Sequence, residues 1–285
     1  MKTSKNIQNL IGCDKTYDEA KIVVFGAPYD GTTSYRPGTR FAAKVMRAES
    51  ILGFETYSPY QDKDLTEISV CDYGDLVLPY GGPELILDII SDFTREVIAD
   101  NKIPVMIGGE HLVTLGTVRA LVEKYPDLHV IHFDAHTDLR HEFFGRELSH
   151  ATVIRRVWDL VGDGKIFQMG IRSGDRSEFE WAKEHLHQCR YNCDTIDYII
   201  EQTKGKPVYV TIDLDVLDPA VFPGTGTPEP GGIDYNTLLN CILKMSELDI
   251  VGADINELSP HYDPSGSSTA VAIKTLRELL LVIHK

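Results

Sequence analysis

Two segments of the sequence end in alternating residues of the types that bind metal ions. Asp134, His136 and Asp138 follow one apolar run, and Asp213 and Asp215 follow another. In an extended chain, alternate side chains point to the same side, so each set can converge on one point. Buried carboxylates and imidazoles gathered in this way carry a large desolvation cost unless a cation compensates them. Both segments therefore predict metal binding.

A sixth candidate ligand, His111, lies in a third segment, where it follows the paired glycines Gly108 and Gly109 after an apolar run. Glycine lets a strand turn tightly into a helix, although a histidine in this position alone also fits a structural role. The three segments together supply four carboxylates and two imidazoles, and the four negative charges balance two divalent cations. Such ligands, without thiolates, favour manganese over structural zinc, while cobalt, nickel or iron could also bind them. Two ions roughly 3.5–4 Å apart lower the pKa of a bridging water, so the predicted reaction is hydrolysis by a metal-bridging hydroxide.

The elements that would position these residues alternate between strand and helix along the chain. Short apolar or β-branched runs predict buried strands at 22–25, 68–71, 103–107, 128–133, 166–169, 208–213 and 250–254. Longer amphipathic stretches predict helices at 83–99, 113–124, 151–160, 194–203, 235–247 and 267–284. Right-handed crossovers place such helices on both faces of a parallel sheet. We therefore expect an α/β fold, a three-layer α/β/α sandwich, with ligands bound beyond the carboxyl ends of its strands.

Length and composition indicate one ordered domain that spans residues 1–285. A hydrophobic fraction of 42% with 25% charged residues is ordinary for a globular chain. The formal net charge of −15 disfavours nucleic acid and anionic membranes as partners. No run of roughly 18 apolar residues predicts a membrane span. Residues 1–20 lack the apolar core of a secretory signal, so we expect a cytoplasmic protein.

The cysteines do not form a recognisable framework. Five cysteines, an odd number, predict reduced thiols instead of structural disulfides. His185, His187, Cys189 and Cys193 lie close together in the sequence, but their spacing matches no common zinc site. Whether Cys189 and Cys193 have a redox role stays open at this point.

Beyond the candidate ligands, the sequence resembles the ureohydrolase family, whose members include agmatinase, arginase and guanidino-acid hydrolases. The matching stretches are 26–41, 108–111, 133–138, 211–232 and 254–260, so the resemblance covers nearly the whole chain. It implies a mostly parallel central sheet of about eight strands and a homo-oligomer, either a trimer or a hexamer. It also implies that a pair of Mn²⁺ ions is used to hydrolyse a guanidinium group to urea and an amine.

The resemblance gives a role to each candidate site residue. One ion would bind His111, Asp134, Asp138 and Asp213, and the other would bind Asp134, His136, Asp213 and Asp215. Asp134 and Asp213 would bridge the ions, which makes Asp134 a catalytic residue as well. Glu257 falls on the guanidinium-binding glutamate of the family, and Thr227 falls on a threonine of the same pocket. A carboxylate suits a planar guanidinium because it accepts two charge-assisted hydrogen bonds.

Three further histidines have open or partly open roles. His150 matches the substrate-binding histidine that acts as an acid or proton shuttle, and its structural alternative is a helix-start histidine that points to solvent. His132 lies two positions before Asp134. Both a packed role and a supporting role near the metals stay open for His132, and His141 is undecided.

The segments around the site favour agmatine as the substrate. Residues 35–41, 149–156 and 170–181 resemble agmatinase. Residues 139–150 lack the asparagine- and serine-rich pattern with which arginase-like members hold an amino-acid substrate. We therefore expect hydrolysis of agmatine to putrescine and urea. A guanidino-acid hydrolase is the second alternative, and arginase is the third.

The group at the far end of the substrate distinguishes an agmatinase from a guanidino-acid hydrolase. Agmatine is a dication, whose terminal ammonium would need a carboxylate, and Asp175, Glu178 and Glu142 are the candidates. Guanidinobutyrate or guanidinopropionate would instead need a cation, which Arg140 or Arg146 could supply. A catalytically silent regulatory relative is the alternative that is not an enzyme, but this sequence keeps all six candidate ligands.

Overall fold

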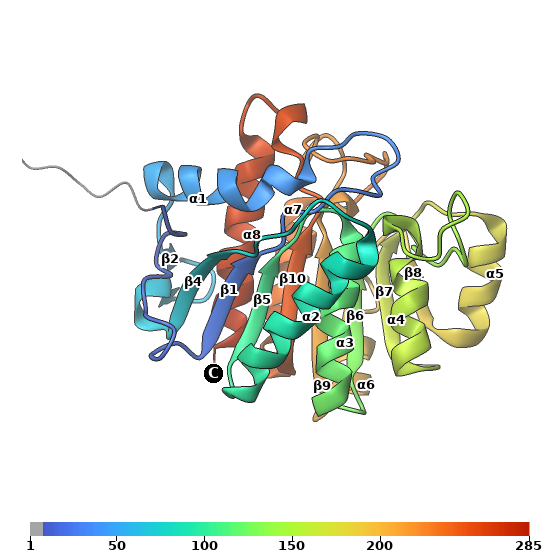
Figure 1. The fold of residues 1–285 in the computed structure, drawn as a ribbon, viewed down its shortest axis with the longest axis horizontal. Helices are drawn as coiled ribbons and strands as arrows, with labels where there is room; N and C mark the ends of the chain where they lie inside the picture. Colours follow the sequence, from blue (N-terminus) through green and yellow to red (C-terminus); the bar gives the residue numbers. More distant parts are fainter. Residues whose placement is uncertain (1–7, 285) are drawn as a thin grey trace, which may run out of the picture.

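The computed structural model describes residues 8–284, so residues 1–7 and 285 of the expected 1–285 domain lie outside the described part of the chain. The centre of the fold is an eight-stranded sheet in the order β4-β1-β5-β10-β9-β6-β7-β8, and all neighbouring strands are parallel (Figure 1). The strands are β1 (Ile22–Gly26), β4 (Val70–Asp75), β5 (Ile103–Ile107), β6 (His129–Phe133), β7 (Ile166–Ile171), β8 (His187–Arg190), β9 (Pro207–Asp213) and β10 (Asp249–Asn256). The predicted α/β class and the parallel sheet of about eight strands are confirmed.

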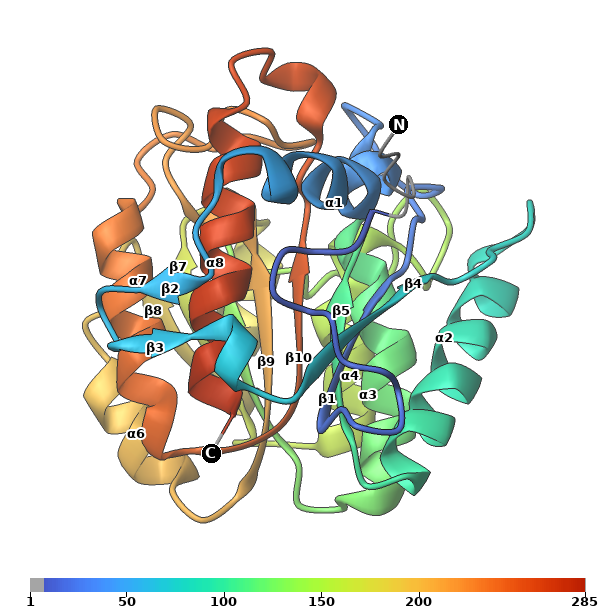
Figure 2. The ribbon, with the colours of Figure 1, turned by 90° about the vertical axis from the view of Figure 1, so that its left-hand side faces the viewer.

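Helices cover both faces of this sheet and complete the predicted three-layer sandwich (Figure 2). One layer contains α2 (Pro83–Ala99), α3 (Thr114–Lys124) and α4 (Val153–Val161). The other contains α1 (Ala42–Gly53), α6 (Ile196–Thr203), α7 (Tyr235–Lys244) and α8 (Ser267–Ile283). Interior strands such as β1, β6 and β7 are wholly buried, which explains why their sequences read as apolar runs and not as alternating patterns. Within residues 8–284, no helix is both long and apolar enough to cross a membrane.

The elements that the sequence pattern did not predict lie mainly at the periphery of the fold. β8 is one of the two edge strands of the sheet, and its residues are buried only in part. The neighbouring helix α5 (Arg176–His185) buries only Glu178 and Ala182, so it has no apolar stripe. A small hairpin of β2 (Tyr57–Ser58) and β3 (Lys63–Asp64) forms a separate two-stranded sheet. Polar or half-exposed elements of this kind give little periodic signal.

Four adjacent strands in the middle of the sheet lead to the candidate site residues. β5, β10, β9 and β6 are neighbours in that order. Because they are parallel, their carboxyl ends meet at one edge, which lies towards the top of Figure 1. β5 leads to His111, β6 to Asp134, β9 to Asp213 and β10 to Glu257. Segments that are far apart in the sequence therefore meet at one place.

Candidate metal centre

Paired glycines bring His111 to the edge of the sheet. A Cβ atom on Gly108 would lie 1.8 Å from Oδ1 of Asn256, and one on Gly109 would lie 1.8 Å from the carbonyl oxygen of Tyr29. Only glycine fits such close approaches. The chain therefore passes from β5 straight into a short 3₁₀ helix, His111–Val113, whose first side chain is fully buried.

The imidazole of His111 faces three carboxylates. Its Nδ1 atom lies 3.1 Å from Asp134, 3.2 Å from Asp138 and 3.4 Å from Asp213, measured to the nearest carboxylate oxygen. Its other nitrogen, Nε2, lies 2.8 Å from the hydroxyl oxygen of Thr211. If Nε2 carries the proton and donates it to Thr211, Nδ1 is free to bind a metal ion among the carboxylates.

Asp134 lies close to three imidazoles, those of His111, His132 and His136. Nδ1 of His136 is 3.4 Å from Oδ1 of Asp134 and 3.0 Å from Oδ2 of Asp215. Potential metal-binding atoms gather in two groups, and within each group the atoms lie within 4.8 Å of one another. The first group is His111, His132 and Asp134, and the second is Asp134, His136 and Asp215. Asp134 belongs to both groups. This arrangement agrees with a binuclear site in which Asp134 is shared.

The reason for this convergence differs from the one expected from strand alternation. β6 ends at Phe133 and β9 ends at Asp213, so all the candidate ligands except Asp213 lie beyond the strands, in a loop or in short 3₁₀ helices. The carboxylate of Asp134 accepts the backbone N–H of His136, and that of Asp213 accepts the backbone N–H of Asp215 at 2.9 Å. Such local turns by aspartate curl the backbone around the acid groups. The expectation that an extended chain would align them was therefore wrong.

Two site residues adopt a backbone conformation that non-glycine residues rarely adopt. Asp138 has a φ of 52°, and Glu257 has a φ of 66°. Conformations of this kind cost about 1–3 kcal/mol each and persist where the surrounding structure requires them. The left-handed turn brings the Asp138 carboxylate back towards His111, at the 3.2 Å distance given above.

The carboxylates of the site repel one another. Burial and the neighbouring Asp134 raise the pKa of Asp138 to about 7. Burial and Asp215 raise the pKa values of Asp213 and Glu257 well above their usual range. A divalent cation among these oxygens would relieve the repulsion, and oxygen donors with two imidazoles suit ions such as manganese. The donor set therefore fits the two metal ions that the sequence predicted.

A cavity of about 290 Å³ opens beside the cluster. Its lining includes His136, Asp138, Thr227 and His150. The Thr227 hydroxyl donates to Asp215 over 3.4 Å, so the predicted pocket threonine does lie beside the cluster. A substrate in this cavity would therefore contact the candidate ligands directly.

His150 is held by a loop that follows β1. Its backbone N–H donates to the hydroxyl of Thr32 at 3.0 Å, and its Nε2 lies 3.1 Å from the hydroxyl of Ser34. Burial and the nearby His136 lower the pKa of His150 to about 4. The ring is therefore neutral at pH 7 and would donate a proton only after accepting one.

Glu257 lies deeper than the cavity lining. Its side chain is 3% exposed, and Oε1 accepts the backbone N–H of His111 at 2.9 Å. Among residues 8–284, no hydrogen-bond donor is paired with its second oxygen, Oε2. Glu257 thus combines a structural contact to the segment of a candidate ligand with a carboxylate oxygen that can accept a further donor.

The three acidic candidates for the far end of the substrate have different positions. Asp175 lines the cavity, and its carboxylate lies 2.7 Å from the guanidinium of Arg140. Glu178 also lines the cavity but is buried, and it accepts the hydroxyl of Thr137. Glu142 is exposed and is not part of the lining. Asp175 is therefore the best placed of the three.

Of the remaining candidates, His141 and Arg146 are exposed and lie outside the lining of this cavity. All five cysteines are buried and free, including Cys189 and Cys193. In the described part of the chain, the stretch 185–193 contributes to neither group of clustered metal donors.

Sequence reasoning missed residues that support the site from inside the sheet or just beyond it. Arg172, which follows β7, donates to the backbone carbonyls of Asp215, Val216 and Glu229 and so fixes the loop after β9. Gln168 contacts His132 inside the sheet. For Gln168, the sequence signal that could have revealed it is a single polar residue within the otherwise apolar strand β7.

Comparisons with known proteins agree with this geometry. The model of the Arginase family matches residues 20–282. An agmatinase of Bacillus cereus is 46% identical over 271 residues, and one of Bacillus subtilis is 45% identical over 269 residues. In both comparisons the match covers 93% of this chain, and it covers 93% and 92% of the two relatives. The crystal structure of the agmatine ureohydrolase of Thermoplasma volcanium superposes with a TM-score of 0.88 at 36% identity, covering 98% of this chain and 95% of that one. The chain therefore belongs to the arginase family.

Proposed function

We propose that the chain is a metal-dependent ureohydrolase that converts agmatine and water to putrescine and urea. The observation that carries the proposal is the cavity of about 290 Å³, which joins the carboxylate and imidazole cluster to the carboxylate of Asp175. One end of this cavity suits a hydrolytic metal centre, and Asp175 suits a second positive charge. The agmatinases among its relatives support the same assignment.

We propose that two Mn²⁺ ions bind the six residues identified from the sequence. The first set is His111, Asp134, Asp138 and Asp213, and the second is Asp134, His136, Asp213 and Asp215. The contacts of Asp134 with His111 and His136 support its place in both sets. Two bound divalent ions would supply Lewis acidity and a water of lowered pKa at neutral pH.

The side chains of this protein would bind and orient the substrate. Glu257 would accept the guanidinium N–H groups through Oε2, with the charge-assisted hydrogen bonds that a carboxylate offers a planar cation. Thr227, which lines the cavity, would limit where the guanidinium can lie. Glu257, Thr227 and His150 thus form the proposed substrate-binding set, with Glu257 and His150 taking part in catalysis together with Asp134.

His150 would transfer the proton that the departing amine requires. A neutral ring that contacts the hydroxyl of Ser34 can accept a proton from water and pass it to the leaving nitrogen. The low pKa of about 4 keeps the ring free of a resting proton at pH 7. An imidazolium formed during turnover would therefore be a ready donor.

We also propose the broader setting that the sequence predicted, namely a single domain of residues 1–285 that assembles as a trimer or hexamer in the cytoplasm. The net charge of −15 supports a small cationic substrate over nucleic acid or an anionic membrane as the partner.

A guanidino-acid hydrolase is the second candidate because Arg140 lines the same cavity. Its guanidinium now lies 2.7 Å from Asp175, and a substrate carboxylate could compete for it. Arginase ranks third. A catalytically silent relative is disfavoured because the chain keeps all six candidate ligands with His150 and Glu257.

The test is urea release by the manganese-loaded protein from agmatine, arginine, guanidinobutyrate and guanidinopropionate in parallel. We expect agmatine to give the highest kcat/KM, and protein treated with a chelator serves as the control. Urea from arginine without urea from agmatine would reject the substrate assignment. No urea from any of the four, with metal bound, would reject the reaction itself.

A further inference from the structure

A row of polar side chains crosses the buried sheet at the level of the candidate metal centre. Gln188, Gln168, His132, Thr211 and Asp254 are register partners on β8, β7, β6, β9 and β10. All except Gln188 have an exposed fraction of 0%. The central strands of a sheet covered on both faces are normally apolar, because a buried polar group without a partner is costly. The row therefore needs an explanation.

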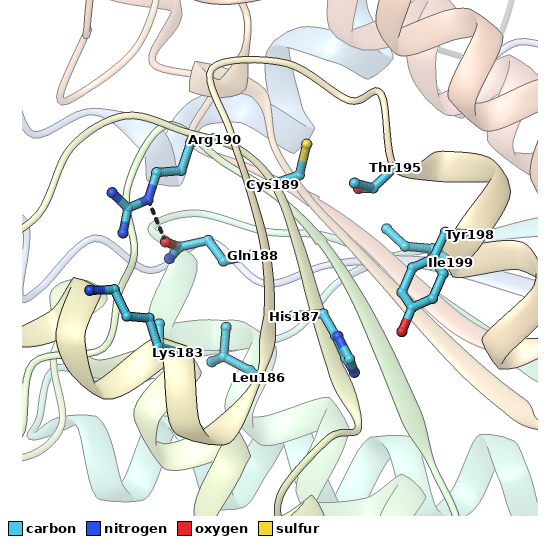
Figure 3. Close-up of a pocket in the computed structure, with 10 residues that line it drawn as sticks. Lys183, Leu186, His187, Gln188, Cys189, Arg190, Thr195, Tyr198 and Ile199 are labelled. Atoms are coloured by element: carbon cyan, nitrogen blue, oxygen red, sulfur yellow. Dashed lines mark hydrogen bonds between the residues drawn. The ribbon is translucent and has the colours of Figure 1, made fainter.

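Hydrogen bonds join the row to Asp134. Nε of Arg190 donates to Oε1 of Gln188 at 3.1 Å, and Nε2 of Gln188 donates to Oε1 of Gln168 at 2.9 Å. Nε2 of Gln168 lies 3.0 Å from Nδ1 of His132, and Nε2 of His132 lies 2.9 Å from Oδ2 of Asp134. Figure 3 shows the outer end of this chain, where Arg190 meets Gln188 in a surface pocket.

The direction of these hydrogen bonds follows from one backbone carbonyl. Nε2 of Gln168 also lies 2.7 Å from the carbonyl oxygen of Thr137, which can only accept. The amide of Gln168 therefore points its NH₂ group at both Thr137 and His132, while its oxygen accepts from Gln188. His132 must then accept at Nδ1 and carry its proton on Nε2, from which it donates to Asp134.

We propose that Gln168 is a positioning residue for the metal centre: by fixing the proton of His132 on Nε2, it fixes the orientation of the Asp134 carboxylate. His132 holds Oδ2 of Asp134, and the backbone N–H of His136 holds Oδ1. With both oxygens held, the carboxylate cannot rotate away from His111 and His136. This inference rests on the proposed function only in taking Asp134 as the shared metal ligand.

Thr211, in the same row, holds the other side of the centre in a similar way. Its hydroxyl oxygen lies 2.8 Å from Nε2 of His111. The row thus orients one carboxylate and one imidazole of the candidate ligand set. Hydrogen bonds to the outer side of metal ligands commonly change metal affinity or activity 10–100-fold when they are removed.

The test compares Gln168→Met with the wild type. Methionine is similar in size and removes only the amide, so we expect Mn²⁺ and Co²⁺ affinity, measured by competition with a chelator, to fall about 10-fold or more. The visible absorption of the Co²⁺-loaded protein should change, and kcat with agmatine should fall while KM stays within about twofold. Gln61→Met is the matched control, because Gln61 also donates its amide to a partner, Glu278, but away from the site. This control should keep the wild-type affinity and spectrum.

A second pair of variants decides the question if Gln168→Met does not fold, as judged by its melting curve. In His132→Gln, the amide NH₂ can still donate to Asp134, whereas in His132→Phe nothing can. We expect His132→Gln to retain more metal affinity than His132→Phe. Equal losses in the two variants, or a folded Gln168→Met protein with wild-type affinity and spectrum, would overturn the proposal.

Metal affinity is measured without substrate, so the two proposals can fail separately. A wild-type protein that binds metal but releases no urea would reject the proposed function and leave this test intact. A wild-type protein that hydrolyses agmatine while Gln168→Met matches it in affinity, spectrum and kcat would reject only the role of Gln168.

Discussion

Replacing Glu257 with glutamine isolates the binding of the guanidinium group. Glutamine has almost the same shape, and its oxygen can still accept the backbone N–H of His111 that Oε1 accepts now at 2.9 Å. The substitution therefore leaves the contact to the metal segment in place. What changes is the second oxygen, which becomes an NH₂ group that would face the N–H donors of the guanidinium in the proposed complex.

The expected loss follows from the number of hydrogen bonds removed. Hydrogen bonds to charged groups contribute about 1.5–3 kcal/mol each, so two lost bonds correspond to about 3–6 kcal/mol. At about 1.4 kcal/mol for each factor of ten, kcat/KM for agmatine should fall roughly 10²–10⁴-fold. Bound manganese should stay at the wild-type level, because Glu257 is outside the proposed ligand sets.

The assay measures urea release and metal content on the same samples. Glu247→Gln is the matched control, since the Glu247 side chain is 62% exposed and forms a surface ion pair with Lys204. A Glu257→Gln protein with full metal content and kcat/KM within about fivefold of the wild type would refute guanidinium binding by Glu257. Loss of metal together with activity would mean that the carboxylate acts mainly by holding His111.

Further variants separate the other proposed roles. Asp134→Ala removes the shared ligand, so metal analysis should show fewer bound ions and urea release should be nearly abolished; near-normal activity would contradict a shared role. His150→Ala should lower kcat by about 10²–10⁴-fold with metal content unchanged, as expected for a lost proton donor; metal loss would instead place His150 among the ligands. Asp175→Asn should raise KM for agmatine about fivefold but not KM for guanidinobutyrate, because a partly exposed ion pair contributes up to about 1 kcal/mol; equal effects on both substrates would exclude recognition of the ammonium. Removing the metals with a chelator should lower the melting temperature, since an ion that binds only the folded state stabilises it; an unchanged melting temperature would argue against a bound metal in the starting protein.

The layered fold could be predicted from the sequence because its strands are buried on both faces. The run 103–107 is wholly apolar and the run 208–213 is mostly apolar, and the structure has strands at both places. β8 could not be predicted in this way. As an edge strand, it consists of His187, Gln188, Cys189 and Arg190, and it has no apolar run to detect.

The types of the site residues were readable from the sequence, but their geometry was not. Aspartates and histidines after apolar runs indicated the cluster that the structure brings together around His111 and Asp134. Asp138 has a φ of 52°, and its carbonyl oxygen accepts the backbone N–H groups of Ile154 and Arg155 on α4, a segment that strand alternation does not take into account. Gln168 was missed for a related reason, since its importance depends on strand register, which places it beside His132.

The register also explains why buried polar residues and buried carboxylates play different parts in this protein. Gln168 and His132 have protein partners for the groups that would otherwise be unpaired, so their burial does not depend on a metal ion. Asp138 and Asp213 are different, because burial and neighbouring carboxylates raise their pKa values. The stabilisation that metal ions bring should therefore come from the carboxylates, whereas the polar row should determine where those carboxylates point. On this reasoning, a substitution in the row alters the affinity and spectrum of the bound metal more than it alters the fold.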